Sequence, residues 1–456
     1  MREALDGCSG VEDCWLYEKS SVKTGQLIEW LERPEWMQYF YGKSVALAFD
    51  NPLHWAFAYV FLDGIAKTIS LLPADLEIEI TRQYFESSGT EIVLHGDDQP
   101  FENVIFQSID FVNINKIFRG QPQPSNSNVT IDLKLKSRWL IPTSGTSGNP
   151  KLIMHTLESL SHTVKRKSEK SGNYHWGMLY KLNRFAGVQV FLQSFLSNST
   201  LIFTNDTLSL SNQIDQLVEG KCNALSGTPT MFRKLLMTRN FDKLDLRQIT
   251  LGGEIVDNQI LQSLSKAQPD ARVVHIYAST EAGVGFAVTD GQSGFPRNFN
   301  GKCVAGIDVK IDNENILWLR NAMIRRENLL EHDEIMNDDG FINTGDVVQL
   351  INNRYQFLGR ENGAINVGGN KILPEEVEQI IQEITQVEIV AVKGMRSSIT
   401  GQIIVAEVVA SDVADAKALK LDILQHCRDR LPDYKVPSLV RMVDDIELSN
   451  AGKLRR

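Results

Sequence analysis

The chain has 456 residues, of which 42% are hydrophobic and 23% charged, a balance typical of a globular protein with two or three packed lobes. Its net charge of −10 argues against a nucleic-acid-binding surface, and no apolar run approaches the about 18 residues of a membrane span. The start, Met1-Arg2-Glu3-Ala4, shows no basic-then-apolar pattern, so no secretory signal is expected.

The cysteines bear on the compartment and on zinc binding. They are odd in number, scattered and without a Cys-x-x-Cys pair: Cys8, Cys14, Cys222, Cys303 and Cys427. This pattern favours reduced thiols in the cytoplasm and predicts no zinc site.

The first packed unit of the chain alternates strands and helices. Residues 45–49 and 69–73 have the apolar character of buried strands, and residues 52–65 between them have helical spacing. Residues 76–88 and 91–94 repeat the alternation. A parallel sheet with helices on its faces, and so an α/β fold, is expected.

A loop of small polar residues follows the strand-like residues 139–141. Its hydroxyls, exposed backbone N–H groups and terminal lysine favour phosphate binding, through Thr143, Ser144, Gly145, Thr146, Ser147, Gly148 and Lys151. It is not a Walker A loop, because Lys151 follows Pro150 and precedes Leu152. The alternative is a plain flexible loop.

Several elements are predicted after this loop. Helices are expected over residues 156–170 and 185–195, and the second is apolar almost all round, which predicts burial in a pocket wall or in plain core. Residues 200–203 form a strand. Residues 224–227 lead into a helix that begins at Thr228-Pro229.

Two strand-to-loop transitions carry polar groups. One ends in Gly252-Gly253-Glu254, and the other runs from residues 273–277 into residues 278–283. In open α/β sheets, ligands bind at the carboxyl ends of the strands. There Glu281 has the oxygen ligand that Mg²⁺ prefers, although it could equally be a capping or solvated glutamate.

The texture beyond residue 301 is that of shorter, alternating β-strands. Asp346 follows Gly345, a suitable place for a carboxylate that accepts hydrogen bonds from two ribose hydroxyls, or for an Asx-turn at a loop tip. Residues 361–363 could form a hinge. Residues 364–456 read as an α+β lobe, with helices at 374–384 and 413–431, strands at 387–392 and 403–409, and Lys453 on a glycine-flanked terminal loop.

Taken together, these motifs resemble the adenylate-forming superfamily of acyl- and aryl-CoA ligases, peptide-synthetase adenylation domains and luciferases. The resemblance covers nearly the whole chain and rests on six motifs in family order. These are residues 143–151, 252–254, 277–281, 344–346, 359–360 and 452–453. It implies a large domain over residues 1–360, built of βαβ sheets with a β-rich subdomain, and a small mobile α+β domain over residues 361–456.

The resemblance implies a two-step reaction. A small carboxylic acid attacks the α-phosphorus of MgATP to give an acyl-adenylate, and the thiol of CoA or of a carrier-protein phosphopantetheine then displaces AMP. The implied catalytic residues are Thr280 at the α-phosphate, Glu281 on Mg²⁺, Arg360 at the ribose and Lys453, which bridges the carboxylate and the α-phosphate. The implied nucleotide contacts, beyond the phosphate loop, are Gly252, Gly253, Glu254, Tyr277, Ala278, Ser279 and Asp346, with Tyr277 stacked on adenine.

The same resemblance implies which residues bind the acid and which residues serve the movement of the small domain. The implied acid pocket contains Tyr180, Phe185, Ala186, Ser226, Gly227, Ala282 and Gly283. Amino-acid-activating relatives carry an aspartate where this chain has Ala186, so an acid without an α-amine, acyl or aryl, is expected. Asn362 stands at the usual hinge aspartate, and Gly368 and Gly369 face the thiol tunnel. Many relatives have a histidine six residues after the loop lysine. Here that position is Leu157, and His155 lies two residues earlier.

Two alternatives remain open at this point. The chain could be an adenylation domain for an amino acid, or a nucleotide-binding relative without turnover. Free CoA and a carrier protein are not distinguished as acceptors by any motif.

Overall fold

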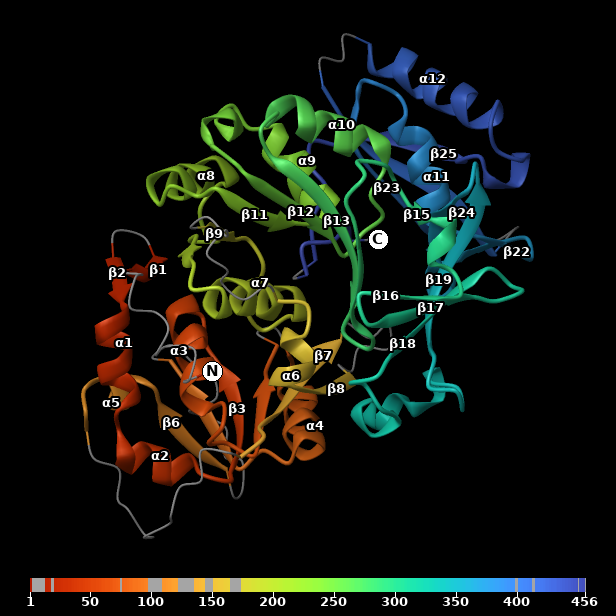
Figure 1. Ribbon diagram of the computed structural model, residues 1–456. Coiled ribbons are helices and arrows are strands. Elements are labelled where there is room, and N and C mark those ends of the chain that lie inside the picture. Colours follow the sequence, from red (N-terminus) through yellow and green to blue (C-terminus); the bar gives the residue numbers. More distant parts are fainter. Residues whose placement is uncertain are drawn as a thin grey trace. The chain divides into compact units, whose positions relative to one another are not determined.

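The computed structural model confirms the α/β class (Figure 1). It describes Met1 and residues 13–17, 20–73, 76–96, 109–121, 135–143, 151–164, 174–397, 401–411, 415–449 and 451–455. Two compact units are present. The first comprises residues 1–226, 279–284 and 322–336, and the second comprises residues 227–278, 285–321 and 337–456. The domain boundary expected at residues 360 and 361 stays a prediction.

The first unit contains the predicted βαβ sheet. Its strands lie in the order β6-β5-β3-β4-β7-β8, of which the first five are parallel and the last is antiparallel. They are β3 (Ser44–Ala48), β4 (Thr68–Leu71), β5 (Ile92–His95), β6 (Asp110–Asn113), β7 (Arg138–Thr143) and β8 (Lys151–Thr156). The predicted strands at 45–49, 69–73 and 91–94 correspond to β3, β4 and β5. Their side chains are buried throughout, which explains why these strands read as continuous apolar runs in the sequence.

The helix between the first two strands is the most buried of this unit. Asn51 caps α3 (Pro52–Leu62) by accepting a hydrogen bond from Leu53 N, and every side chain from Trp55 to Leu62 is buried. Other helices here are α1 (Thr24–Leu31), α2 (Pro34–Phe40), α4 (Ile78–Ser88) and α5 (Asn115–Phe118). The Tyr59 hydroxyl of α3 donates to Leu182 O at 2.5 Å, which anchors the chain just before α7 (Phe185–Leu196).

A second group of strands completes the first unit. They lie in the order β11-β9-β10-β1-β2, with β2 antiparallel to β1. They are β1 (Asp13–Tyr17), β2 (Ser20–Lys23), β9 (His175–Met178), β10 (Thr200–Phe203) and β11 (Ala224–Gly227). The helices α7 and α8 (Leu210–Glu219) alternate with these strands in the chain, and α7 packs on β9 and β10.

One predicted helix is much shorter than expected. Thr156 caps α6 (Leu157–Ser161), but residues 162–164 leave the helix, so the prediction of a helix from 156 to 170 is wrong at these positions. The amide of Val164 donates to Ser161 O at 3.0 Å, three residues back, which is a turn bond in place of helical continuation. The basic run at residues 165–167 lies outside the described residues.

The second unit begins with α9 (Pro229–Leu236) and the parallel pair β12 (Gln248–Gly252) and β13 (Arg272–Ser279), joined by α10 (Asn258–Ala267). The strand β14 (Gly283–Val288) follows. An antiparallel sheet then lies in the order β15-β20-β19-β18-β17-β16, which confirms the β-rich texture beyond residue 301. Its strands are β15 (Phe295–Pro296), β16 (Lys302–Val304), β17 (Ile307–Ile311), β18 (Ile316–Asn321), β19 (Ile342–Ile351) and β20 (Arg354–Arg360).

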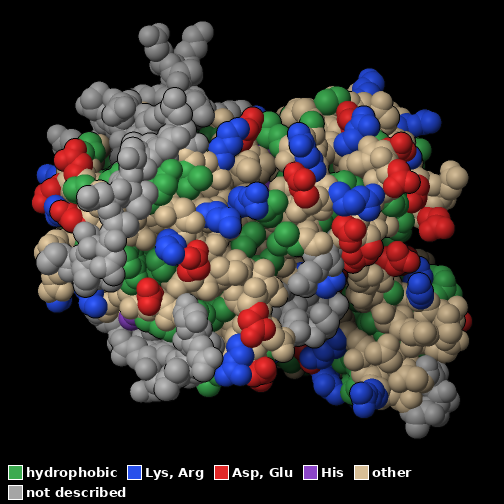
Figure 2. All heavy atoms as spheres, turned by 90° about the horizontal axis from the view of Figure 1, so that it is seen from below, with side chains coloured by type: hydrophobic (Ala, Val, Ile, Leu, Met, Phe, Trp, Pro, Cys, Tyr) green, Lys and Arg blue, Asp and Glu red, His purple; other side chains and the backbone are tan. Residues whose placement is uncertain are grey.

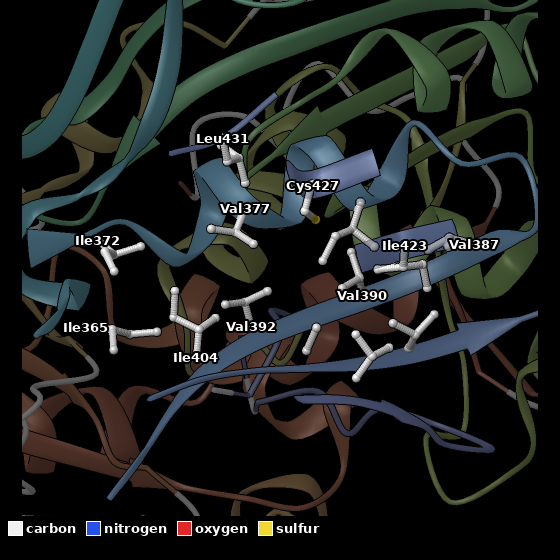
Figure 3. Close-up of a cluster of buried hydrophobic side chains, with 14 of the residues drawn as sticks. Ile365, Ile372, Val377, Val387, Val390, Val392, Ile404, Ile423, Cys427 and Leu431 are labelled. Atoms are coloured by element: carbon white, nitrogen blue, oxygen red, sulfur yellow. The ribbon is translucent and has the colours of Figure 1, made fainter. Parts of the chain in front are cut away.

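The carboxy-terminal part of the second unit has the predicted α+β order. It contains β21 (Ile365–Val367), β22 (Asn370–Ile372), α11 (Pro374–Gln382), β23 (Val387–Ser397), β24 (Gly401–Ala410), α12 (Ala416–Arg428) and β25 (Leu439–Met442). Figure 3 shows its core, in which Val377 of α11 and Ile423 and Cys427 of α12 lie over Val390 and Val392 of β23. All five side chains are almost fully buried, so this part has a hydrophobic core of its own.

Charge on the surface is mixed. On the face shown in Figure 2, Lys and Arg side chains are interspersed with Asp and Glu among the residues that are coloured there. None of the helices among the described residues combines the length and the apolar character of a membrane span.

Candidate functional site

The two ends of the predicted phosphate loop lie opposite each other. Thr143 is the last residue of β7 and Lys151 the first of β8, and the two are direct antiparallel partners. Residues 144–150 therefore connect the strands of a hairpin. Of the loop residues, Ser144, Gly145, Thr146, Ser147 and Gly148 lie outside the described residues.

Lys151 has an ionic neighbour that a ligand can displace. Its ammonium lies 4.0 Å from Glu334 Oε1, and the two side chains are 36% and 61% exposed. An exposed pair at this distance contributes little to stability. The Lys151 amine is therefore accessible to a stronger anion than a carboxylate.

A buried histidine connects β8 with the turn after β13. His155 Nε2 donates to Thr280 O at 2.7 Å, and the imidazole also lies 5.6 Å from the Phe185 ring. Burial lowers the pKa of His155 to about 4, so the ring is neutral at pH 7. His155 was noted in the sequence only as a displaced motif residue, and its contact with Thr280 joins positions 125 residues apart.

The turn that carries the proposed metal ligand is short. Thr280, Glu281 and Ala282 connect β13 and β14, and Ala282 N donates to Ser279 Oγ at 3.1 Å. Ala278 and Ser279 were expected in a loop but belong to β13, so the strand continues two residues further than predicted. The Glu281 side chain is half-buried, and one carboxylate fits Mg²⁺, which takes one or two protein carboxylates together with phosphate oxygens and water.

The residues predicted for the acid pocket are mostly buried. Tyr180, Phe185, Ser226 and Ala282 have exposed fractions of 9% or less, while Ala186 on the first turn of α7 is half-buried. Gly227 ends β11, and Gly283 begins β14 with a φ of +75°. Their assignment to an acid pocket stays a prediction.

In the second unit, three of the predicted nucleotide residues form one cluster. The Tyr277 hydroxyl donates to Asp346 Oδ2, and Arg360 Nε lies 2.9 Å from Asp346 Oδ1. Burial raises the pKa of Asp346, and the charges of Arg360 and Lys453 oppose that rise. Lys453 and Asp346 are 107 positions apart, yet the ammonium acts on this carboxylate.

Asp346 lies in the interior of β19, opposite Arg360 of β20, so the suggestion of a loop tip is wrong. Gly345, with a φ of +69°, lets the strand turn the aspartate toward Tyr277. The Tyr277 ring itself lies parallel to the rings of Phe286 and Phe357, with centroids 5.3 and 5.4 Å away. Stacking of adenine on Tyr277 stays a prediction.

The Gly-Gly-Glu segment contacts the terminal loop. Glu254 accepts hydrogen bonds from Thr230 N and Leu454 N, and the Lys453 Cε atom lies 3.3 Å from the position of a Cβ added to Gly253. Gly252 is buried at the end of β12. Thr228, which the sequence indicated only as the cap of α9, donates to Gly452 O.

The predicted hinge and thiol-facing glycines lie on exposed turns. Asn362 is exposed in a 3₁₀ turn, Glu361–Gly363, between β20 and β21. Gly368 and Gly369 connect β21 with β22, and their φ values of +57° and +90° are those of a two-residue hairpin turn that favours glycine. Their roles in motion and thiol access stay predictions.

Two family models match successive parts of the chain. Residues 42–317 match the family model described as AMP-binding enzyme, and residues 376–453 match the AMP-binding enzyme C-terminal domain. A 2-succinylbenzoate–CoA ligase of Lactococcus lactis is 23% identical over 428 residues, which cover 90% of this chain and 89% of that protein.

Two solved structures show the same fold over 99% of this chain. The anthranilate CoA ligase AuaEII in complex with anthranoyl-AMP has a TM-score of 0.80 at 17% identity, with 95% of its chain covered. The o-succinylbenzoate coenzyme A synthetase of Bacillus subtilis in complex with ATP and magnesium ion has a TM-score of 0.75 at 18% identity, with 98% covered.

Proposed function

The chain belongs to the AMP-binding enzyme family, and on this premise we propose that it is an ATP-dependent ligase that joins a carboxylic acid to a thiol through an acyl-adenylate. The observation that carries the proposal is the cluster of Tyr277, Asp346 and Arg360, which lies in the same compact unit as the terminal loop with Lys453. A carboxylate and a guanidinium placed for a ribose, with a lysine that can neutralise charge at the α-phosphate, would suit adenylate formation.

The first step joins two anions, so its barrier is mostly one of positioning and charge. The carboxylate oxygen of the acid attacks the α-phosphorus, and the bond to pyrophosphate breaks. Lys151, Thr143 and the intervening loop hold the β- and γ-phosphates, and Thr280 contacts the α-phosphate. No general base is needed, because the acid is already ionised at neutral pH.

The remaining residues hold the nucleotide and neutralise charge. Asp346 and Arg360 hold the ribose, and Lys453 bridges the carboxylate and the α-phosphate as negative charge moves. Glu281 would hold Mg²⁺, which supplies charge neutralisation to the phosphate oxygens when bound. His155 supports the same step by fixing the carbonyl of Thr280, which sets the geometry of the turn.

In the second step a thiol attacks the carbonyl carbon of the adenylate. The C–S bond forms, the C–O bond to AMP breaks, and the thiol proton passes to solvent. The thiol is that of CoA, because the relatives reported above are named CoA ligases. Asn362 serves as the hinge between steps, and Gly368 and Gly369 face the thiol.

The acid is an aryl acid without an α-amine. Two observations support this: Ala186 offers no carboxylate to a buried ammonium, and the relatives are named for 2-succinylbenzoate and anthranilate. The enzyme works in the cytoplasm, where thiols stay reduced. In support, Cys222, Cys303 and Cys427 form no disulfide.

Acid-dependent exchange of pyrophosphate into ATP, across a panel of aryl, fatty and amino acids, tests the proposal. The largest exchange is expected with an aryl acid, and addition of CoA to that reaction should give the aryl thioester. No exchange across the panel contradicts the enzyme assignment. The largest exchange with an amino acid would overturn the inference from Ala186.

A further inference from the structure

The Glu254 carboxylate is occupied by two backbone amides from distant segments. Oε2 accepts from Thr230 N at 3.0 Å, on the first turn of α9, and Oε1 accepts from Leu454 N at 2.8 Å. The second bond spans 200 positions. Both carboxylate oxygens therefore accept hydrogen bonds from protein amides, which indicates a structural role for Glu254 besides contact with adenine.

A second hydrogen bond holds the residue that precedes Lys453. The Thr228 hydroxyl donates to Gly452 O at 2.5 Å and accepts from Met231 N at 3.1 Å, so this one hydroxyl both caps α9 and holds the terminal loop. Glu254 and Thr228 thus hold the two residues that flank Lys453.

The terminal loop itself fits closely against this surface. A Cβ on Gly452, whose φ is +70°, would lie 2.5 Å from Met231 Sδ, and a Cβ on Gly253 would lie 3.3 Å from Lys453 Cε. Within the loop, Ser449 N donates to Lys453 O at 2.7 Å, and Gly452 N donates to Ser449 O at 2.8 Å. The loop is therefore a compact turn that docks as one piece.

We propose that Glu254 and Thr228 form a latch that positions Lys453 for adenylate formation and releases the terminal loop for thioester formation. This inference rests on the proposed two-step function. A carboxylate suits the task because it accepts from both amides, and hydrogen bonds to a charged acceptor are about twice as strong as neutral ones. The latch holds backbone groups of the loop at Gly452 and Leu454, on either side of Lys453.

Variants of Glu254 separate the two half-reactions. Glu254→Gln keeps one acceptor oxygen and turns an NH₂ group toward the other amide, so adenylate formation should fall about tenfold. The KM for ATP should stay within about twofold, because both Glu254 oxygens accept from protein amides and their loss acts on the terminal loop. Thioester formation from a supplied aryl-adenylate and CoA should be unchanged.

Thr228 provides a test with a conservative rescue. Thr228→Val removes the hydroxyl and should impair adenylate formation in the same selective way, whereas Thr228→Ser retains the hydroxyl and should restore it. Asp257→Asn is the matched control. Asp257 lies three residues beyond Glu254 and caps α10, and it forms no hydrogen bond or ion pair with a described residue of the terminal loop. Asp257→Asn should keep the wild-type rates of both adenylate formation and thioester formation.

Hydrogen exchange of the terminal peptide, residues 447–456, gives a readout that does not depend on turnover. Exchange should be faster in Glu254→Gln and Thr228→Val than in the wild type and in Asp257→Asn. Equal loss of both half-reactions, or unchanged exchange in both latch variants, overturns the latch. If the wild type activates no acid in the panel, the proposed function fails, while the exchange experiment still decides whether the loop is latched.

Discussion

The chain carries two lysines on loops, and they are held in different ways. Lys151 begins β8, and the backbone pairing with Thr143, eight residues away, fixes its position. Lys453 lies in a short turn closed by its own backbone bond with Ser449, and side chains more than 190 positions away hold its neighbours Gly452 and Leu454. A local hairpin suits a lysine that stays with the phosphates, and side-chain ties suit a lysine that must leave between two steps.

The difference has an energetic side. Pairing in a sheet is shared among many backbone bonds, so Lys151 cannot leave without opening β7 and β8. The terminal loop is held by a few bonds, each contributing on the order of 1 kcal/mol. Such a contact can open and close on the timescale of turnover.

Replacement of Lys453 should have the largest effect on activity. Lys453→Ala should lower adenylate formation by about 10³-fold, because it removes a charge that acts mainly in the transition state. Thioester formation from a supplied aryl-adenylate should stay near wild type. Separate assays of the two half-reactions check this split, and equal loss in both would contradict the account of a lysine that leaves.

The strand that holds Lys151 should show a pH-dependent stability through His155. The pKa is lowered to about 4 in the folded state, so the unfolded chain takes up a proton first as pH falls below about 6.5. Stability from this group is fully present above pH 6.5 and is lost toward pH 4. The loss should be about 2 kcal/mol between pH 7.5 and 5.

Urea unfolding at the two pH values, in the wild type and in His155→Gln, isolates this contribution. Glutamine can still donate to Thr280 O but does not titrate, so the variant should lose the His155 share of the pH dependence. His275, whose pKa is also lowered by burial, contributes equally to both proteins. An identical pH dependence in the two proteins would show that His155 is not buried as described.

Replacement of Lys151 should have a smaller effect on activity, and the effect should be on ATP binding. Lys151→Ala should raise the KM for ATP about tenfold, because a phosphate contact held through the whole reaction contributes to binding. Lys151→Arg, which keeps the charge, should recover part of that loss. A change confined to kcat would place Lys151 with Lys453 as a group that acts only in the transition state.

The smallest effect is expected at the hairpin between β21 and β22. Gly368 has a φ of +57°, so Gly368→Ala should destabilise the protein by about 1 kcal/mol. Adenylate formation should be unchanged, as judged by pyrophosphate exchange. Gly368→Asn is the control, since asparagine tolerates this backbone conformation and should cost less.

The sequence predicted the parts of the fold that depend on local pattern. Uniform burial makes β3 a continuous apolar run, and the asparagine–proline start of α3 is a local capping signal. The motifs also indicated Lys151, Asp346, Arg360 and Lys453 as candidate site residues, of which the structure brings Asp346 and Arg360 together. Their roles at the nucleotide remain predictions.

What the sequence could not give depends on long-range contacts. The Thr228–Gly452 and His155–Thr280 hydrogen bonds join residues whose types are common in caps and cores, so neither type signals its partner. The end of α6 at Ser161 was missed because polar residues after it are compatible with a helix. An Asx-turn at a loop tip was left open for Asp346 because a preceding glycine suggests a turn, whereas Gly345 here bends a continuous strand.

The most direct test of the central claim is detection of the intermediate without a thiol. The wild type would be mixed with MgATP and the best aryl acid of the panel, quenched and analysed for nucleotide products. The account predicts aryl-AMP and pyrophosphate in equal amounts, with release of AMP only when CoA is added. Formation of ADP, or thioester formation with no adenylate detectable at any time, would contradict it.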